Sequence, residues 1–423
     1  MLCHVPVEAR SRLVLRTRTT RNLQQLLRVM TARTPSSHAI GIAQLVAWGT
    51  TFYAIPPLLP SISTDLGTSM SALSIAMTAG LVFNAVASLA VARWIQRRGA
   101  RAPMVVGSIT ASIALLVVAA SPGAAIAFGG LTLLGAAHAA LLYEPAFAAV
   151  SAQTTNPLAR TRAIQIVTFW GGWAALWALP AASLLGDACG WRATLLLLSA
   201  LLAVHTIRIH ARLPIAAARE TSRSATAPIS IGLAIAFALG AFATTAVVVN
   251  GLMLLADRSL SLGTASIVFA LLAPLQVIGR LWFMRRNGQL GRHDGSIPFL
   301  LVAAGLIALL AAPEIYALAS FVVLFGAGAG LLTTLRAAVV VRIAPDHVAQ
   351  QLGVYNFVSS LARALAPAVS SGLYFAFGYE LALITFSALA LVAAVLVWHA
   401  TSCRCSSVPI GACSRLTHLS CAQ

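Results

Sequence analysis

The chain has 423 residues, of which 59% are hydrophobic and only 9% are charged, and its formal net charge is +18. Soluble proteins carry about 25% charged residues, so the composition excludes an ordinary soluble protein and indicates that lipid is the solvent. The positive charge is spread through short gaps between apolar segments, so we expect anionic lipid headgroups as its partner and no nucleic acid.

The predicted elements begin after an arginine-rich tail. Twelve apolar segments follow it, and about 20 residues of helix cross about 30 Å of hydrocarbon. Transmembrane strands would be shorter and would alternate strictly, so we expect an all-α polytopic membrane protein. The predicted spans are 39–61, 71–92, 103–121, 124–147, 163–185, 192–208, 229–255, 264–284, 297–312, 315–341, 350–377 and 380–399.

The arginines fall mainly into alternate gaps between the spans. All 28 basic residues are Arg, and 23 lie in the two tails or after even-numbered spans, whereas only Arg192 and Arg258 lie in the remaining gaps. By the positive-inside rule, both termini are predicted to be cytoplasmic. The absence of Lys indicates a GC-rich bacterial source, so we expect a multi-pass protein of the bacterial cytoplasmic (inner) membrane.

The two halves of the chain resemble each other at an offset of 188 residues, which places Trp94 on Trp282 and Gly190 on Gly378. Because six spans return the chain to the same side, the halves are predicted to be parallel repeats related by an axis along the membrane normal. The predicted parts are a tail (1–38), a six-helix bundle (39–208), a cytoplasmic linker (209–228), a second six-helix bundle (229–399) and a tail (400–423).

The gap between spans 2 and 3 reads Ala-Arg-Trp-Ile-Gln-Arg-Arg-Gly-Ala-Arg over 92–101. It resembles the Gly-x-Leu-x-Asp-Arg-x-Gly-Arg-like loop of the major facilitator superfamily of secondary transporters. Arg97, Gly99 and Arg101 match that loop, whereas Ala92 and Gln96 replace its first Gly and its Asp. The resemblance covers 39–399 and implies a carrier without cofactors that alternates access around a central site, with Arg97, Gly99 and Arg101 in a conformational loop.

Two stretches, 142–147 and 276–280, resemble more narrowly the bacterial members related to monocarboxylate carriers. Related carriers use an Arg in span 8 to hold a carboxylate, and Arg280 lies in that span. The resemblance therefore implies that Arg280 binds substrate. Because Arg280 is only about 8 Å from the predicted cytoplasmic loop, snorkelling to the headgroups is the alternative.

Four charged residues lie within the spans, and they are Arg280, Arg336, Arg363 and Glu144. A charge at a helix centre costs about 2.5 to 3.5 kcal/mol by insertion scales, so such residues normally face a cavity or a partner. Arg363 is the deepest, and a guanidinium can pair with two carboxylate oxygens at once. We therefore predict that Arg363 anchors an anion.

Glu144 and Arg336 lie near the cytoplasmic ends of spans 4 and 10. One interpretation is a gate pair between the halves, and the other is that Glu144 pairs with Arg97 or Arg101 within the loop scaffold. Glu144 is also the candidate proton carrier, together with His138. The alternative for His138 is a satisfied polar residue between helices.

Further candidates for the cavity wall are Tyr53, Asn250, Gln276 and Trp173. Trp173 belongs to a stripe with Trp170 and Trp177 on one helix face, which predicts either an aromatic wall or plain packing. We expect no metal, because the spacings of the cysteines in the last 21 residues fit no known zinc site.

These features predict a monomeric secondary carrier of a small organic anion such as a carboxylate, with protons as the candidate coupling ion. The alternatives are a proton-driven exporter of amphipathic or toxic compounds and, in another class, a transporter-like membrane receptor. An enzyme is not expected, since Glu144 and His138 alone do not make a nucleophile with its base.

Overall fold

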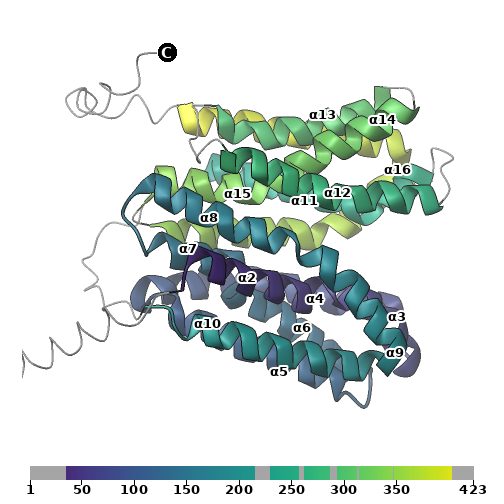
Figure 1. Ribbon diagram of the computed structural model, residues 1–423. Coiled ribbons are helices and arrows are strands. Elements are labelled where there is room, and N and C mark those ends of the chain that lie inside the picture. The colour runs from purple at the N-terminus through teal and green to yellow at the C-terminus, as the bar shows by residue number, and fades with distance from the viewer. Residues whose placement is uncertain are drawn as a thin grey trace, which may run out of the picture.

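The computed structural model describes residues 35–214, 229–256, 262–285, 293–311, 314–345 and 347–402. Within these ranges the regular structure is helical and contains no strand. The helices run alongside one another as two bundles, with the N-terminal half below and the C-terminal half above in Figure 1. Both predicted tails lie almost entirely outside the described residues, as do Arg258 and most of the predicted linker.

The N-terminal half forms six spans, several of which are divided into shorter helical pieces. They are α2 (Ser37–Trp48), η1 (Gly49–Tyr53) and α3 (Ile55–Asp65); α4 (Met70–Arg98); α5 (Arg101–Ala119); α6 (Ala124–Leu141) and α7 (Tyr143–Ser151); α8 (Pro157–Gly172) with the first part of α9 (Ala174–Leu202); and the rest of α9 with η2 (Ala203–Ile207) and α10 (Arg208–His210).

The C-terminal half repeats this arrangement. Its elements are α11 (Ile231–Ala256), α12 (Leu262–Arg285), η3 (Asp294–Ser296), α13 (Ile297–Ala311), α14 (Glu314–Ser320), η4 (Phe321–Phe325), α15 (Gly326–Ile343) and α16 (Val348–Ser402). η4 is a π-helical turn that joins α14 to α15 in one span.

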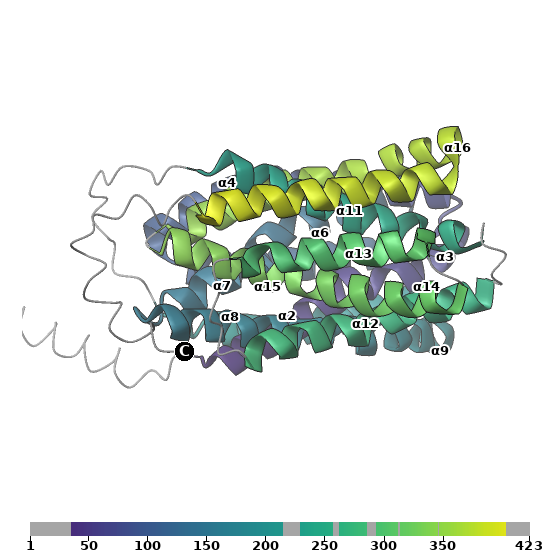
Figure 2. The same cartoon turned by 90° about the horizontal axis from the view of Figure 1, so that it is seen from above.

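Two long helical segments each contain two spans. Gly190 in α9 has φ of 80° and Gly378 in α16 has φ of 82°, a left-handed conformation that glycine adopts without strain. Of nine helices long and apolar enough to cross a membrane in the described residues, two are 54 residues long and contain these glycines. With α12 the count is twelve, as predicted. Figure 2 shows α16 turning back at one end of the molecule.

Local sequence sets where several helices begin. Ser36 and Ser69 cap α2 and α4, because their side chains accept from the N–H groups of Ala39 (3.2 Å) and Ala72 (3.1 Å). Asn156 caps α8, and Pro157 then occupies the first turn, where its missing N–H is no loss.

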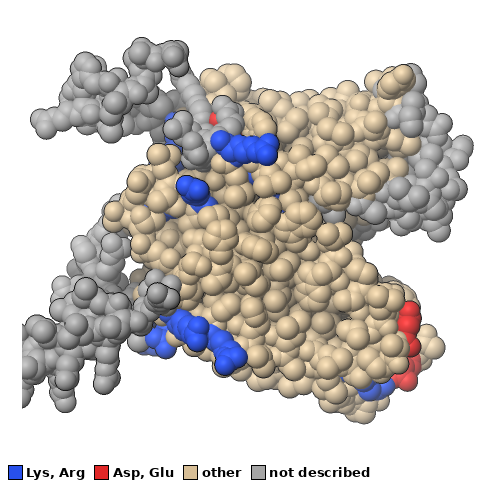
Figure 3. Space-filling view, in the orientation of Figure 1, with Lys and Arg blue, Asp and Glu red and all other residues tan. Residues whose placement is uncertain are grey.

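The two ends of the molecule differ in charge. Apart from Arg192, the described arginines of the interhelical gaps lie at the end where α2 begins and α4, α12 and α15 finish, which we call the arginine-rich end. Figure 3 shows basic side chains toward the left, and acidic side chains next to a basic one at the lower right. At the other end of the molecule, which we call the opposite end, Arg192 forms an ion pair with Asp65.

The two halves contact each other toward the arginine-rich end. There α4 packs against α16, and α8 packs against α12 and α15. Gln96 Nε2 donates to Gln350 Oε1 (3.2 Å), and Ser88 Oγ donates to the Gly353 carbonyl (3.1 Å). Arg160 adds a hydrogen bond to the Pro345 carbonyl (2.9 Å). These contacts close the arginine-rich end.

Candidate functional site

A cavity of about 460 Å³ lies between the two halves. This size suits a small organic molecule. The wall is mainly apolar and aromatic, with polar groups at a few positions. Its members include Trp48, Phe52, Tyr53, Leu81, Asn84, Leu134, His138 and Tyr143 from the N-terminal half, and Phe237, Thr244, Gln276, Arg280, Thr333, Arg336, Ser359 and Arg363 from the C-terminal half.

Arg363 lies half-buried in the wall, on α16. Its Nη2 donates to Asn356 Oδ1 (3.3 Å) and to Ser360 Oγ (3.1 Å), and both acceptors are uncharged. Asn356 Nδ2 in turn donates to Asn84 Oδ1 across the halves (3.4 Å). Among the described residues no carboxylate forms an ion pair with Arg363, whose guanidinium lines the cavity.

Arg280 lies in α12 and is only 6% exposed. Its Nε donates to the Gly330 carbonyl (3.1 Å) on α15, and its Nη1 donates to the Thr168 carbonyl (2.9 Å) on α8. The side chain thus turns into the protein and does not extend to the headgroups. It joins the two halves and at the same time lines the cavity.

Glu144 and Arg336 form an ion pair across the halves, with 2.5 Å between Oε1 and Nη2. Their side chains are 14% and 7% exposed. The helix of span 4 breaks at Leu142, which has ψ of −150°, so that Glu144 falls in the first turn of α7, where the helix N-terminus favours a carboxylate. Of the two interpretations of Glu144, the structure shows the pair with Arg336.

The predicted wall residues Tyr53, Gln276 and His138 all line the cavity. Tyr53 belongs to η1, a π-helical turn within span 1, and such turns are frequent at functional sites. His138 is 5% exposed, and its Nε2 has no hydrogen-bond partner among the described residues. Asn250 lies on α11 at a position whose side chain is outside the described part of the structure.

The tryptophan side chains of the stripe in span 5 pack mainly against neighbouring helices and do not form the cavity wall. A Cβ on Gly41 would overlap the Trp170 side chain, and one on Gly49 would overlap Trp177. Trp173 packs edge-on against Phe169, with 6.1 Å between the ring centroids, and is not among the residues that line the cavity. The geometry therefore favours packing as the main role of this stripe.

The loop between spans 2 and 3 turns at Gly99, whose φ is 75° and whose N–H donates to the Ile95 carbonyl (2.8 Å). Arg97 is exposed, and Arg101 is the first residue of α5. Gln96, which stands where the superfamily loop has Asp, makes the cross-half hydrogen bond to Gln350. A neutral amide thus joins the halves at this point.

Sequence reasoning missed Asn356, Ser360 and Thr168. Asn356, Ser360 and Arg363 are spaced four and three residues apart on one helix face, and this spacing could have identified the first two. Thr168 contributes a backbone carbonyl to Arg280 and accepts at Oγ1 from Thr334 (3.2 Å). A backbone contact of this kind leaves no signal in the side-chain pattern.

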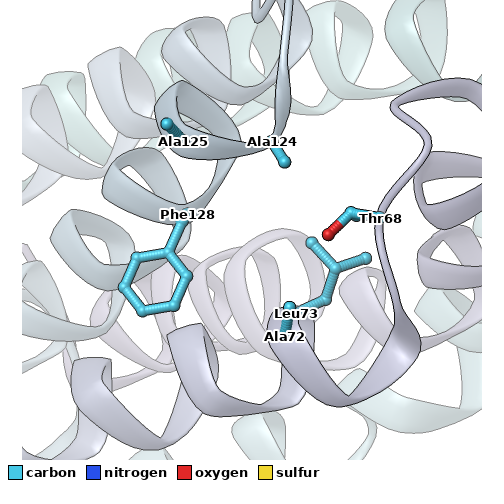
Figure 4. A pocket seen from close by; sticks show the side chains of 6 residues that line it. All are labelled: Thr68, Ala72, Leu73, Ala124, Ala125 and Phe128. Atoms are coloured by element: carbon cyan, nitrogen blue, oxygen red, sulfur yellow. The ribbon is translucent and has the colours of Figure 1, made fainter.

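A second, smaller pocket of about 340 Å³ lies near the opposite end (Figure 4). It is lined by Thr68, Ala72, Leu73, Ala124, Ala125 and Phe128. Thr68 contributes the one side-chain hydroxyl of this lining and no charged group lines it, so the pocket has no charge to bind an anion. The central cavity is the candidate site.

Among the solved structures similar to this one are several transporters. The crystal structure of the human organic anion transporter MFSD10 gives a TM-score of 0.68 at 17% identity, covering 86% of this chain and 100% of that chain. The E. coli fucose:proton symporter FucP gives 0.70 at 12%, covering 85% and 97%. A structure of FucP in the outward conformation gives 0.71 at 11%, with the same coverage. At these identities the likeness shows the fold alone.

No curated protein matches the sequence. The family model of the Major Facilitator Superfamily matches residues 40–232 and again residues 231–404, so that nearly all of the described chain is covered by the two matches. The chain therefore belongs to the Major Facilitator Superfamily.

Proposed function

We propose that this multi-pass transporter carries a small organic anion by alternating access, with the substrate bound in the central cavity between its halves. The observation that carries the proposal is Arg363, a half-buried guanidinium that lines the cavity, donates to two neutral acceptors and forms no ion pair with a carboxylate of the described residues. A charge at membrane depth is costly unless a partner compensates it, and a bound anion would supply that partner.

The cavity also favours an organic body on the anion. Apolar and aromatic side chains such as Trp48, Phe52 and Phe237 make up most of its wall, whereas arginines occupy a few positions. Small-molecule sites commonly combine an apolar wall with a few polar groups that fix orientation. A carboxylate attached to an apolar group is complementary to this surface.

We propose Glu144 and His138 as the groups through which protons are coupled to transport. Glu144 is the one carboxylate among the four charged residues of the spans, and it is paired with Arg336 in this conformation. Protonation of Glu144 would remove half of that ion pair, so it would favour separation of the halves at the arginine-rich end. We further propose that this end is cytoplasmic and that the membrane is a bacterial inner membrane.

Uptake into proteoliposomes tests the proposal. The purified protein is reconstituted, a pH gradient is imposed, and uptake of radiolabelled acetate, benzoate and succinate is measured. We expect uptake of at least one of them by the intact protein and its loss in Arg363→Ala and Arg280→Ala. Arg162→Ala is the matched control, because Arg162 is exposed on α8, away from the cavity. If none of the three anions is taken up, or if Arg363→Ala transports normally, the anion site is refuted.

The apolar wall also supports the exporter of amphipathic or toxic compounds as a second candidate. In that case the aromatic residues Trp48 and Phe52 would matter more than Arg363. Extrusion of an amphipathic dye from the same proteoliposomes, unchanged by Arg363→Ala, would favour the exporter. Binding of an anion without any accumulation would favour a transporter-like receptor.

A further inference from the structure

Arg280 connects the candidate site to the contact between the halves. Its guanidinium lines the cavity, and its Nη1 donates to the Thr168 carbonyl on α8 of the other half. We propose that a bound anion breaks this hydrogen bond and thereby weakens the contact between the halves at the arginine-rich end. We further propose that Gly172 positions the Arg280 guanidinium for the bond. This inference rests on the proposed function.

The first support is that two of the three nitrogens of the Arg280 guanidinium already donate to backbone carbonyls. A guanidinium has five N–H donors and binds a carboxylate bidentately through either of two forks of parallel N–H groups. Each fork includes Nε or Nη1, and in Arg280 these atoms donate to the Gly330 and Thr168 carbonyls. Nη1 has two N–H groups, so a bidentate carboxylate on the Nη1–Nη2 fork shares Nη1 with the Thr168 carbonyl, and it draws the guanidinium away from that carbonyl toward the cavity.

The second support is the place of Gly172. A Cβ at Gly172 would overlap Nη1 of Arg280, with the guanidinium carbon 3.2 Å away. Gly172 is the last residue of α8 and also lines the cavity, so Nη1 lies at the cavity wall. The absence of a side chain at this one position is what lets the guanidinium reach the Thr168 carbonyl.

The competition between the anion and the Thr168 carbonyl for Arg280 favours the anion. Hydrogen bonds between a guanidinium and a carboxylate are stronger than those between a guanidinium and a neutral carbonyl. An anion that withdraws Nη1 from Thr168 removes a hydrogen bond that exists only while the halves are closed at this end. It therefore binds the closed state less tightly than the opened one, and that difference shifts the equilibrium toward opening.

The test measures the closed fraction directly. The six native cysteines are replaced by serine, and spin labels are attached through Thr155→Cys and Arg285→Cys, which are exposed positions of different halves at the arginine-rich end. We expect Gly172→Ala to push the flexible guanidinium off Thr168 without other rearrangement. Without any anion, the ratio of closed to open molecules should then fall about tenfold, as expected for one hydrogen bond to a charged group.

Anion affinity is a second measurement, and it distinguishes the proposed coupling from a general loss of structure. Because coupling between opening and anion binding is mutual, Gly172→Ala should bind benzoate or succinate more tightly than the unsubstituted protein, by up to the same factor. Binding is measured by equilibrium dialysis with the radiolabelled anion. In the unsubstituted protein the bound anion should widen the label distance, and in Gly172→Ala it should add little.

Two further variants secure the result. Gly129→Ala is the matched control, since a Cβ there meets nothing within 4 Å, and it should leave distance and affinity unchanged. Arg280→Lys keeps the charge but replaces the fork by a single ammonium, so it should also open the arginine-rich end.

Specific results would overturn the inference. If Gly172→Ala and Arg280→Lys both keep the closed label distance of the unsubstituted protein, the hydrogen bond from Arg280 to Thr168 does not hold the halves together. If an anion binds the unsubstituted protein and the distance does not change, the coupling is wrong while the proposed function stands. If none of acetate, benzoate and succinate binds, the proposed function fails and the coupling falls with it.

Discussion

The ion pair between Glu144 and Arg336 should hold the arginine-rich end closed, and Glu144→Gln tests this. Both side chains are largely buried, at 14% and 7% exposed, and they belong to different halves. Breaking one side of a buried pair costs about 3 to 5 kcal/mol. Glutamine keeps an oxygen that accepts from Arg336, so we take the lower value of about 3 kcal/mol.

Glu144→Gln destabilises the closed conformation alone by this amount. When the halves separate, water reaches Arg336 and replaces the lost partner, so the open conformation loses little. About 3 kcal/mol corresponds to a factor of about 150 in the equilibrium between closed and open molecules. Arg336 Nε has no hydrogen-bond partner among the described residues, which leaves this guanidinium especially dependent on Glu144.

The assay is the distance between spin labels at Thr155→Cys and Arg285→Cys, with and without Glu144→Gln. Asp65→Asn is the control, because the Asp65–Arg192 pair lies within one half and its side chains are 47% and 43% exposed. An exposed pair contributes only about 0 to 1 kcal/mol, so the control should keep the closed distance. An unchanged distance in Glu144→Gln would refute the reasoning.

A charge swap gives a second, independent answer on the same pair. Glu144→Arg and Arg336→Glu should each abolish uptake, because each places two like charges together at membrane depth. The double variant restores opposite charges across the halves. If it recovers none of the uptake that the single variants lose, the pair does not act as a gate.

Two further outcomes concern glycines. Gly378→Ala should lower the free energy of unfolding of the detergent-purified protein by about 1 to 2 kcal/mol, because an L side chain is strained at φ of 82°. Gly372→Ala is the control and should not lower it. A Cβ meets nothing within 4 Å at either position, so the two variants differ in backbone strain and not in overlap. Gly353→Ala should favour opening of the arginine-rich end, because its Cβ would overlap that of Ala92 across the halves; a label distance like that of the unsubstituted protein would contradict this.

Span positions were predictable because hydropathy is a local property. About 20 apolar residues must form a helix in lipid wherever they pack, since no water is available to satisfy the backbone. The helices accordingly agree with the predicted spans to within six residues at each end, and the largest shifts are at the end of α4, which continues to Arg98, and at the start of α8, which begins at Pro157. The turns at Gly190 and Gly378 were visible as the repeated Gly-aromatic dipeptide, because a left-handed turn requires a residue without Cβ.

Charge cost likewise marks candidate site residues without a structure. Arg280, Arg336, Arg363 and Glu144 stood out because a charge inside hydrocarbon needs a partner or a cavity. Sequence reasoning could name Glu144 and Arg336 as a pair only as one of two alternatives, because charge identifies what needs a partner and does not choose among several. Three-dimensional packing of α7 against the C-terminal half made that choice.

By itself, the sequence determined the number of spans, their order and the membership of the superfamily, because each depends on local composition or on short motifs. Only the tertiary structure decided that Arg280 binds the Thr168 carbonyl rather than reaching the headgroups, that Asn356 and Ser360 hold Arg363, and that Trp173 lies away from the cavity wall. Those outcomes depend on the rotation of each helix about its own axis and on backbone atoms, which are the same in every residue, so no pattern of side chains records them.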